Sequence, residues 1–136
     1  MFNYDLEQIK RDEGFRAKMY KCSEGFNTIG YGTNLDVGLT EEEAEAVLLV
    51  RLKNIDKELV DRLPLYFKVS GEIQNILVNM AYNLGVSGLL KFKKTLSALE
   101  CKDYQTAADE MLDSRWARQV GLRAYRLADR VRQCEK

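Results

Sequence analysis

The amino-acid sequence predicts a mostly helical α+β domain with one small β-hairpin near its start. Three observations predict this class: a segment dense in strand-forming residues and glycine at 17–32, helical spacing of apolar residues over most of the remainder, and a helix-capping box at Thr40. We expect one domain over residues 1–136. In it a long helix joins a hairpin lobe at about 14–35 to a helical lobe at about 63–136, which also takes the N-terminal helix.

The first helix is predicted from about Tyr4 to Glu13. Leu6, Ile9 and Glu13 fall at spacings of three and four residues, so one face of the helix carries all three. Gly14 follows at once and suits the left-handed conformation that ends a helix.

A hairpin is predicted next. Residues 18–21 and 27–31 have the aromatic and β-branched composition of strands, and residues 23–25 have that of a turn. A long helix that separates this hairpin from a helical lobe would leave a cleft between them, and substrate sites favour such clefts.

Helices are predicted for the rest of the chain. The capping box at Thr40 begins a long helix that runs to about Asp61 and is broken by Pro64, the only proline. Residues 70–84 form a second strong helix closed by Gly85. Shorter helices are predicted at 88–92, 95–100, 104–112 and 122–134.

Composition excludes several kinds of site. The chain has no histidine, which removes a Ser-His-Asp triad, a Cys-His dyad and any histidine-ligated metal site. Cys22, Cys101 and Cys134 are odd in number and widely spaced, so neither a disulfide framework nor a metal site is expected. Reduced thiols are typical of a cytoplasmic protein. We expect no metal and no organic cofactor.

Two further patterns bear on location. Residues 1–5 lack the basic segment and apolar run of a signal peptide. The most apolar stretch, residues 44–52, contains Glu45 and Arg51 and is too short to span a bilayer. We therefore expect synthesis in the cytoplasm and no stable membrane insertion.

The formal net charge is zero, but basic residues gather toward the C-terminus. This cluster is compatible with a solvated helix face and equally with a patch that meets an anionic surface, such as a bacterial wall. It has no nucleic-acid-binding motif beside it, and we expect no nucleic-acid partner. Its members are Arg115, Arg118, Arg123, Arg126, Arg130, Arg132 and Lys136.

Glu13 is the candidate proton donor. On the face of Leu6 and Ile9 it points toward packed structure, and desolvation would raise the pKa of its carboxyl group. The negative end of the helix dipole acts in the same direction. Both effects favour the protonated acid that glycosidic cleavage requires. The alternative is a glutamate at a frayed helix end, paired with Lys10 or Arg16.

The residues after Glu13 change that balance. Eight residues separate Glu13 from Cys22, and five separate Cys22 from Thr28. With its flanking residues 11–14, 20–25 and 28–32, this segment resembles the phage lysozyme family, the T4-type muramidases. The signature of that family is a Glu, eight residues, an Asp or Cys, five residues and a Thr.

The resemblance extends along essentially the whole chain, although residues 34–69 are generic. Residues 79–85 resemble the end of the family's central helix, and Phe92 with Leu96 fits the segment that follows. Residues 114–116 and 123–126 resemble its C-terminal signature. The resemblance implies a lysozyme-like fold.

It also implies roles for individual residues. Glu13 would be the general acid, and Thr28 would help to hold the attacking water. Arg123 would pair with the catalytic glutamate, which opposes the upward pressure on its pKa. Tyr31 and Gly32 would lie near the sugar-binding cleft.

Asn83 occupies a third cleft position by the same resemblance. Its alternative is a polar residue at a helix C-terminus before Gly85. We expect Trp116 and Phe92 to belong to the core and not to form sugar platforms.

Cys22 stands where many family members have aspartate. A thiol is mostly neutral at neutral pH, but Lys21 or a nearby arginine could lower its pKa and supply a thiolate. A thiolate could activate water, with inversion at the anomeric carbon, or attack that carbon itself, with retention. The alternative is a small buried cysteine at a strand end.

The resemblance implies a lysozyme or endolysin that hydrolyses the β-1,4 bond between N-acetylmuramic acid and N-acetylglucosamine in bacterial peptidoglycan. Such a phage or prophage enzyme would wait in the host cytoplasm, as a monomer, until a holin releases it to the periplasm and cell wall. Two rival functions stay open: a lytic transglycosylase on the same bond, and a catalytically silent wall-binding or virion protein of the same fold.

Overall fold

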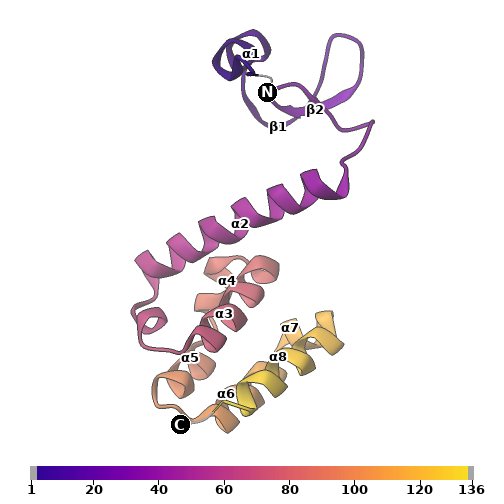
Figure 1. Cartoon of the computed structure of the whole chain (residues 1–136). Helices are drawn as coiled ribbons and strands as arrows, with labels where there is room; N and C mark the ends of the chain where they lie inside the picture. Colours follow the sequence, from indigo (N-terminus) through magenta and orange to yellow (C-terminus); the bar gives the residue numbers. More distant parts are fainter. Residues whose placement is uncertain (1–2, 135–136) are drawn as a thin grey trace. The chain divides into compact units, whose positions relative to one another are not determined.

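The structure is a computed structural model that describes residues 3–134. The chain divides into two compact units, Met1–Val47 and Leu48–Lys136, and the boundary falls inside helix α2 (Glu41–Arg62). The first unit holds the small antiparallel sheet and the second is helical, which confirms the α+β, mostly α class (Figure 1). The N-terminal helix clusters with the sheet, whereas the sequence analysis places it with the helical lobe.

Helix α1 (Leu6–Glu13) begins the N-terminal unit. The Asp5 carboxylate accepts a hydrogen bond from the Gln8 amide at 3.1 Å, and Gly14 ends the helix with φ of 72°. The predicted end at Glu13 is confirmed. The helix buries none of its residues, however, and Leu6 and Ile9 are exposed.

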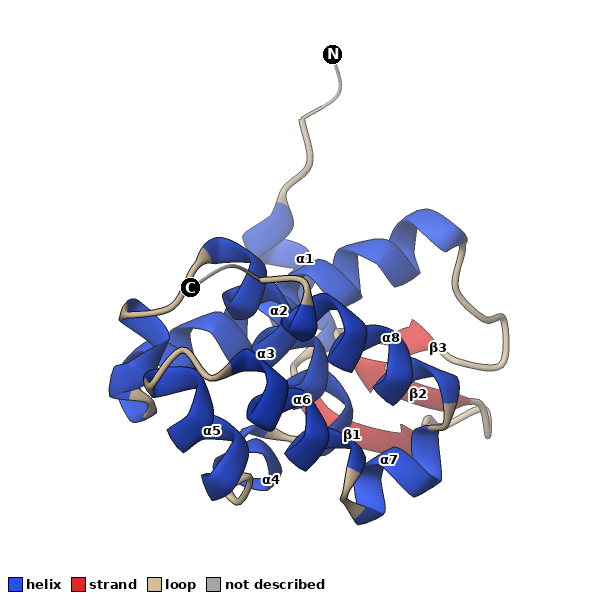
Figure 2. Ribbon diagram, turned by 90° about the horizontal axis from the view of Figure 1, so that it is seen from below, coloured by secondary structure: helices blue, strands red, loops and turns tan. Residues whose placement is uncertain are grey.

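The sheet has three antiparallel strands in the order β1 (Arg16–Lys21), β2 (Asn27–Gly30), β3 (Thr33–Asn34) (Figure 2). The first two form the predicted hairpin, with Tyr20 of β1 opposite Thr28 of β2. The sequence analysis does not predict β3, because two residues are too few to show a strand pattern.

Helix α2 carries the predicted capping box. The Thr40 amide donates to Glu43 Oε1 at 2.8 Å, and the Glu43 amide donates to Thr40 Oγ1 at 3.1 Å. The helix ends before Pro64, which begins the short 3-10 helix η1 (Pro64–Phe67). Among the described residues, no helix has the length and apolar character needed to cross a membrane.

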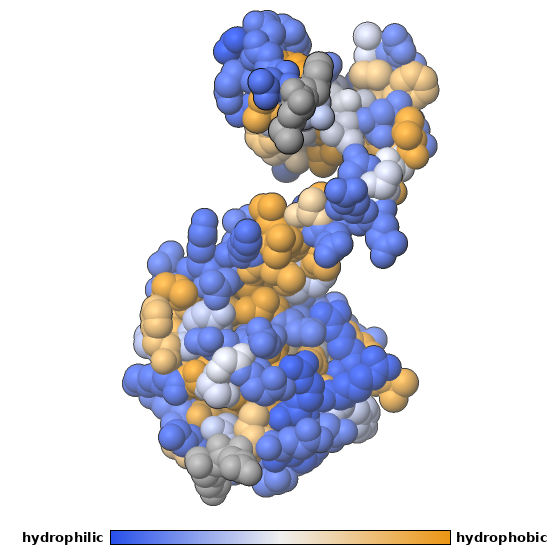
Figure 3. All heavy atoms as spheres, viewed as in Figure 1, coloured by the Kyte–Doolittle hydropathy of each residue, from blue (hydrophilic) through white to orange (hydrophobic). Residues whose placement is uncertain are grey.

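The C-terminal unit contains the second part of α2 and six more helices. They are α3 (Gly71–Leu84), α4 (Val86–Leu90), α5 (Lys93–Glu100), α6 (Tyr104–Leu112), α7 (Arg115–Val120) and α8 (Leu122–Arg132). Their core is one cluster of buried apolar side chains whose largest fully buried members are Leu59, Ile73, Ile76, Leu77, Met80, Leu89, Met111 and Val131. Much of the surface of this unit is hydrophilic, while apolar side chains lie exposed on α2 (Figure 3).

Most of these helices follow their sequence signals. The predicted helix at 104–112 is found with the same bounds, and the helix predicted at 70–84 is found at Gly71–Leu84, with Ser70 as its N-cap. Helix α7 is not predicted, although Ser114 is a helix-capping residue and its hydroxyl accepts from the Ala117 amide at 3.0 Å. Six residues hold too little periodicity to predict a helix.

Candidate active site

The side chain of Glu13 lies at the C-terminal end of α1 and is exposed within the N-terminal unit. The expected shelter from Leu6 and Ile9 is therefore not found among residues 3–47, because both side chains are themselves exposed. The alternative ion pairs are not formed there either. Lys10 lies 3.6 Å from Glu7, and Arg16 stacks over the ring of Tyr20 at 4.2 Å.

The Glu13 carboxylate instead lies against the backbone of Gly32. A Cβ built on Gly32 would fall 2.9 Å from Glu13 Cδ and would overlap the carboxylate oxygen Oε2. Gly32 also has φ of 77°, in the region that side-chain-bearing residues rarely adopt. The positive φ favours glycine at this position, and the short distances place the two predicted site residues in contact.

Tyr31 is half exposed and lies between two neighbours. Its ring centroid is 5.4 Å from that of Phe15, and Lys10 Nζ lies 5.5 Å from the same Tyr31 centroid. The sequence analysis names Tyr31 as a cleft residue but gives no site role to Phe15 or Lys10. Both contact the ring of Tyr31, the residue that precedes Gly32 in the chain.

Cys22 and Thr28 meet at one backbone carbonyl. The amide of Cys22 and the hydroxyl of Thr28 both donate to the Phe26 carbonyl oxygen, each at 2.9 Å. Thr28 is buried, with 4% of its surface exposed, whereas Cys22 is half-buried. The turn at 22–26 thus joins two of the three predicted catalytic residues.

The pKa of the Cys22 thiol is lowered from its ordinary value. The backbone amide of Phe26 contributes most, followed by the amide of Glu24, and the Thr28 hydroxyl adds to them, while burial and the charge of Glu24 oppose the shift. The predicted direction is confirmed, but its cause differs from the expected one. Backbone amides of the turn stabilise the sulfur anion, not Lys21.

Asn83 lies in the C-terminal unit, near the end of α3. Its side-chain oxygen accepts a hydrogen bond from the indole nitrogen of Trp116 at 2.9 Å. Trp116 is buried and packs edge-on against Phe92, with ring centroids 6.0 Å apart, so the expected core position of Trp116 is confirmed. This contact gives Asn83 a structural role, and its role in sugar binding stays a prediction.

Arg123 also lies in the C-terminal unit and is bound to Asn79 of α3. Its Nε and one terminal nitrogen donate to Asn79 Oδ1 at 3.0 and 2.6 Å, and the same nitrogen donates to the Asn79 carbonyl at 3.0 Å. The sequence analysis assigns no role to Asn79. Its signal is its spacing, one helical turn before Asn83 on the same helix. The predicted pairing of Arg123 with Glu13 stays a prediction.

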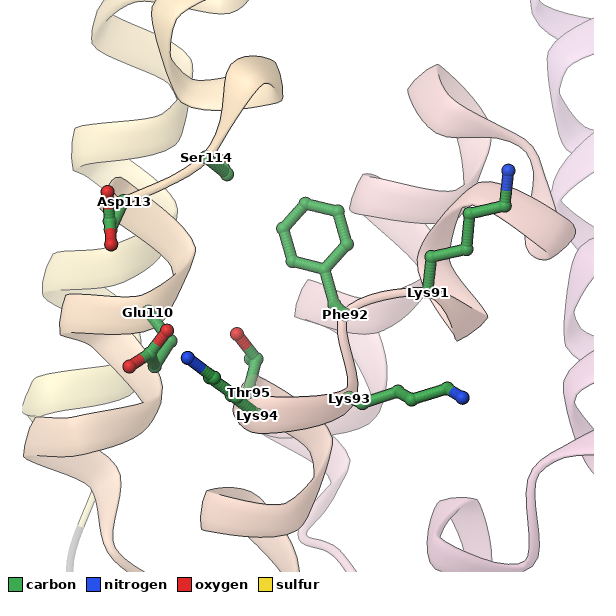
Figure 4. A pocket seen from close by; sticks show the side chains of 8 residues that line it. All are labelled: Lys91, Phe92, Lys93, Lys94, Thr95, Glu110, Asp113 and Ser114. Carbon is green, nitrogen blue, oxygen red and sulfur yellow. The ribbon is translucent and has the colours of Figure 1, made fainter.

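A surface hollow of about 360 Å³ opens in the C-terminal unit beside α5. The Phe92 ring and the Thr95 hydroxyl point into it, and the Lys94 amine turns toward Glu110 (Figure 4). It contains both charge signs and none of the predicted site residues. Within residues 3–134, no group of three or more cysteines and acidic residues is placed to hold a metal ion.

A comparison with known families decides the affiliation. The model of the family described as phage lysozyme matches residues 10–135. The chain belongs to the phage lysozyme family. All seven predicted site residues lie inside the match, and the family carries a lysozyme-like function.

Individual relatives agree with this affiliation. Probable T4-type lysozyme 1 of Dictyostelium discoideum is 28% identical, over 89% of both chains. The endolysin of Acyrthosiphon pisum secondary endosymbiont phage 1 is 29% identical, over 83% of this chain and 77% of the endolysin. The pre-baseplate central spike protein Gp5 of Enterobacteria phage T4 is 29% identical over 89% of this chain, which spans 26% of Gp5.

Proposed function

We propose that this member of the phage lysozyme family is an endolysin-type muramidase that hydrolyses the β-1,4 bond between N-acetylmuramic acid and N-acetylglucosamine in bacterial peptidoglycan. The contact of the Glu13 carboxylate with Gly32 carries the proposal, because it brings the candidate proton donor together with a second residue of the predicted site. A carboxyl group is the usual proton donor for the cleavage of a glycosidic bond. Cys22 and Thr28 supply the second half of the site from the same unit.

The reaction needs one proton donor and one anion. The carboxylic acid of Glu13 donates its proton to the glycosidic oxygen as the bond to the anomeric carbon breaks. The thiolate of Cys22 stabilises the positive charge that develops on the sugar and takes a proton from water, whose hydroxide adds to the anomeric carbon. Proton transfer from the thiol to the Glu13 carboxylate, through solvent, then restores both groups.

The same thiolate has a second route, in which the sulfur attacks the anomeric carbon and water later displaces it. The first route inverts the configuration at that carbon, and the second retains it. NMR of the reducing end within seconds of cleavage distinguishes the two anomers. Oxygen-18 water labels the new hydroxyl group in both routes.

The biological setting follows from the same proposal. The enzyme acts as a monomer, without metal, organic cofactor or nucleic acid. It waits in the host cytoplasm until a holin opens the membrane, and then cuts the wall from the periplasmic side and lyses the host cell.

Glu13→Gln tests the proposal, with Glu42→Gln as the matched control. Both variants exchange one exposed carboxylate for an amide within the N-terminal unit. Loss of a general acid lowers the rate by roughly 100-fold or more. Clearing of permeabilised Gram-negative cells should therefore fall at least that far in Glu13→Gln and stay at the wild-type rate in Glu42→Gln. Equal rates of clearing by Glu13→Gln and wild type would refute the proposed enzyme activity.

Two rivals are separated by product and by activity. A lytic transglycosylase uses one acid and releases anhydro-sugar ends, which mass spectrometry finds one water lighter than reducing ends. A catalytically silent virion protein is the second rival, since one relative is named a central spike protein. It would bind sedimented walls as well in Glu13→Gln as in wild type and would release no muropeptides.

A further inference from the structure

Thr28 is held in an unusual position for its unit. It is the only buried residue among residues 3–47, and it lies on the central strand, opposite Tyr20 of β1 and Asn34 of β3. Burying a hydroxyl group without a hydrogen-bond partner costs free energy, so the hydrogen bonds of Thr28 determine the orientation of its hydroxyl group. Its proton goes to the Phe26 carbonyl at 2.9 Å.

That carbonyl does not depend on Thr28. A carbonyl oxygen accepts two hydrogen bonds, and here the second comes from the Cys22 amide at 2.9 Å. If the Thr28 hydroxyl turned away, the Phe26 oxygen would keep the bond that closes the turn. Cys22, which carries the sulfur, and Thr28 therefore donate hydrogen bonds to the same carbonyl oxygen.

A hydroxyl group has one proton and donates to one acceptor at a time. We propose that Thr28 is a positioning residue for Cys22, and that its O–H turns from the Phe26 carbonyl to the sulfur when the thiol ionises. The S–H bond breaks as the thiol proton passes to a solvent water, while the hydroxyl proton of Thr28 stays on its own oxygen. The inference rests on the proposed function, in which Cys22 supplies the anion.

The charge of the turn supports this arrangement. The Thr28 hydroxyl is one of the groups that lower the pKa of the Cys22 thiol, together with the amides of Phe26 and Glu24. A hydrogen bond to an anion is stronger than one to a neutral carbonyl, so ionisation favours the turn of the hydroxyl. The Glu24 carboxylate opposes ionisation.

Other titratable groups surround the turn. Tyr20 and Lys21 lie on β1, and Asp36 accepts hydrogen bonds from the amide and side chain of Asn27 at 3.1 and 3.0 Å. Each of them is the same in the variants compared below. Differences between those variants therefore report on Thr28.

The test measures the alkylation rate of Cys22 by iodoacetamide from pH 5 to pH 10. Cys101→Ser and Cys134→Ser are introduced first, so that Cys22 is the single thiol; both are in the C-terminal unit. The midpoint of alkylation reports the thiolate. Thr28→Val, which keeps the shape and removes the hydroxyl, should raise the midpoint by about one pH unit. Thr28→Ser should restore it.

A second measurement needs no variant. The ¹³C chemical shift of the Phe26 carbonyl in the wild-type protein should change with pH at the same midpoint as the alkylation rate. The reason is that the carbonyl loses its hydrogen bond from the Thr28 hydroxyl as the sulfur ionises. A Phe26 shift that does not follow the thiol would overturn the inference, even if Thr28→Val failed to fold. So would an unchanged midpoint in a folded Thr28→Val.

The pH profile of wall cleavage separates this role from that of holding water. If Thr28 acts through Cys22, Thr28→Val loses activity at neutral pH and recovers most of it above its raised midpoint. If Thr28 holds the attacking water, the loss is the same at every pH, and the positioning role is refuted. Alkylation is measured without substrate, so this test is independent of wall cleavage. If Thr28→Val shifts the alkylation midpoint while Glu13→Gln clears walls at the wild-type rate, the proposed muramidase activity is rejected and the positioning role of Thr28 is kept.

Discussion

The two units of the chain differ in what holds them in shape. In the C-terminal unit a continuous apolar core runs from Leu59 to Val131, whereas in the described part of the N-terminal unit only Thr28 is buried. The N-terminal unit is shaped by caps, by the hydrogen bonds of its turn and by glycines with positive φ. The proposed chemistry lies on this thinly packed unit. Substitutions there should change activity more than stability, and substitutions in the helical unit should do the reverse.

Two methionines give the largest and most direct test of this contrast. Met80 is fully buried in the C-terminal unit, and Met19 is 58% exposed in the N-terminal unit. Met80→Ala should lower the free energy of unfolding by about 2–5 kcal/mol, because it leaves a cavity. Met19→Ala should stay within about 0.5 kcal/mol of wild type. Urea unfolding followed by circular dichroism measures both, and equal losses would break the comparison.

A pair of glycines tests the other half of the contrast. Gly32 and Gly38 have φ of 77° and 86°, so alanine strains the backbone at both, but only at Gly32 would its Cβ strike Glu13. Gly32→Ala should displace the carboxylate and reduce wall clearing by roughly 100-fold. Gly38→Ala should clear walls at nearly the wild-type rate. Similar rates in the two variants would show that strain alone, and not the contact, matters.

The sequence predicts the parts of this molecule that depend on neighbours along the chain. The capping box at Thr40 and the regular apolar spacing of α6 and α3 are local signals, and these helices are found where predicted. Helix α7 and strand β3 are too short to carry a period. Contacts between distant residues leave no local trace, so neither the Glu13–Gly32 contact nor the Asn79–Arg123 bonds could be derived.

The candidate site follows the same division. The spacing of Glu13, Cys22 and Thr28 identifies the site by resemblance to a family, and the predicted shelter of Glu13 by its own helix is wrong for the N-terminal unit alone. That shelter depends on what lies against α1, which spacing within α1 does not describe. The lowered pKa of Cys22 comes from backbone amides of its turn, and the way these amides point depends on how the turn folds.

Helix caps allow a finer comparison. The Ser70 hydroxyl accepts from the Ile73 amide at 3.3 Å and starts α3 of the core, while Asp5 starts α1, which buries nothing. Ser70→Ala should cost about 1 kcal/mol of unfolding free energy. Asp5→Ala should leave the urea midpoint unchanged and speed amide hydrogen exchange in α1. A shifted midpoint in Asp5→Ala would show that α1 contributes to the global fold.

The smallest effect concerns the ion pair between Glu72 of α3 and Arg130 of α8, whose Oε1 and Nε atoms are 2.7 Å apart. The hydrogen bond from Arg130 lowers the pKa of the Glu72 carboxyl group in the folded protein. A lowered folded-state pKa gives stability that is complete above the unfolded value, near pH 4.3, and is lost as the pH falls through the folded value. Glu72→Gln should therefore unfold at slightly lower urea than wild type at pH 7.

The same variant should approach wild type as the pH falls through the lowered folded-state pKa, because the carboxyl group is then protonated in both states. The side chains are half exposed, so the difference at pH 7 is small. Glu7→Gln, which removes the exposed pair with Lys10 on α1, is the control from the other unit. Its urea midpoint should equal that of wild type at pH 7 and at low pH, because α1 buries no side chain. A pH-dependent shift in Glu7→Gln would mean that the N-terminal unit shares in the global stability, and the contrast between the units would then hold for burial but not for energy.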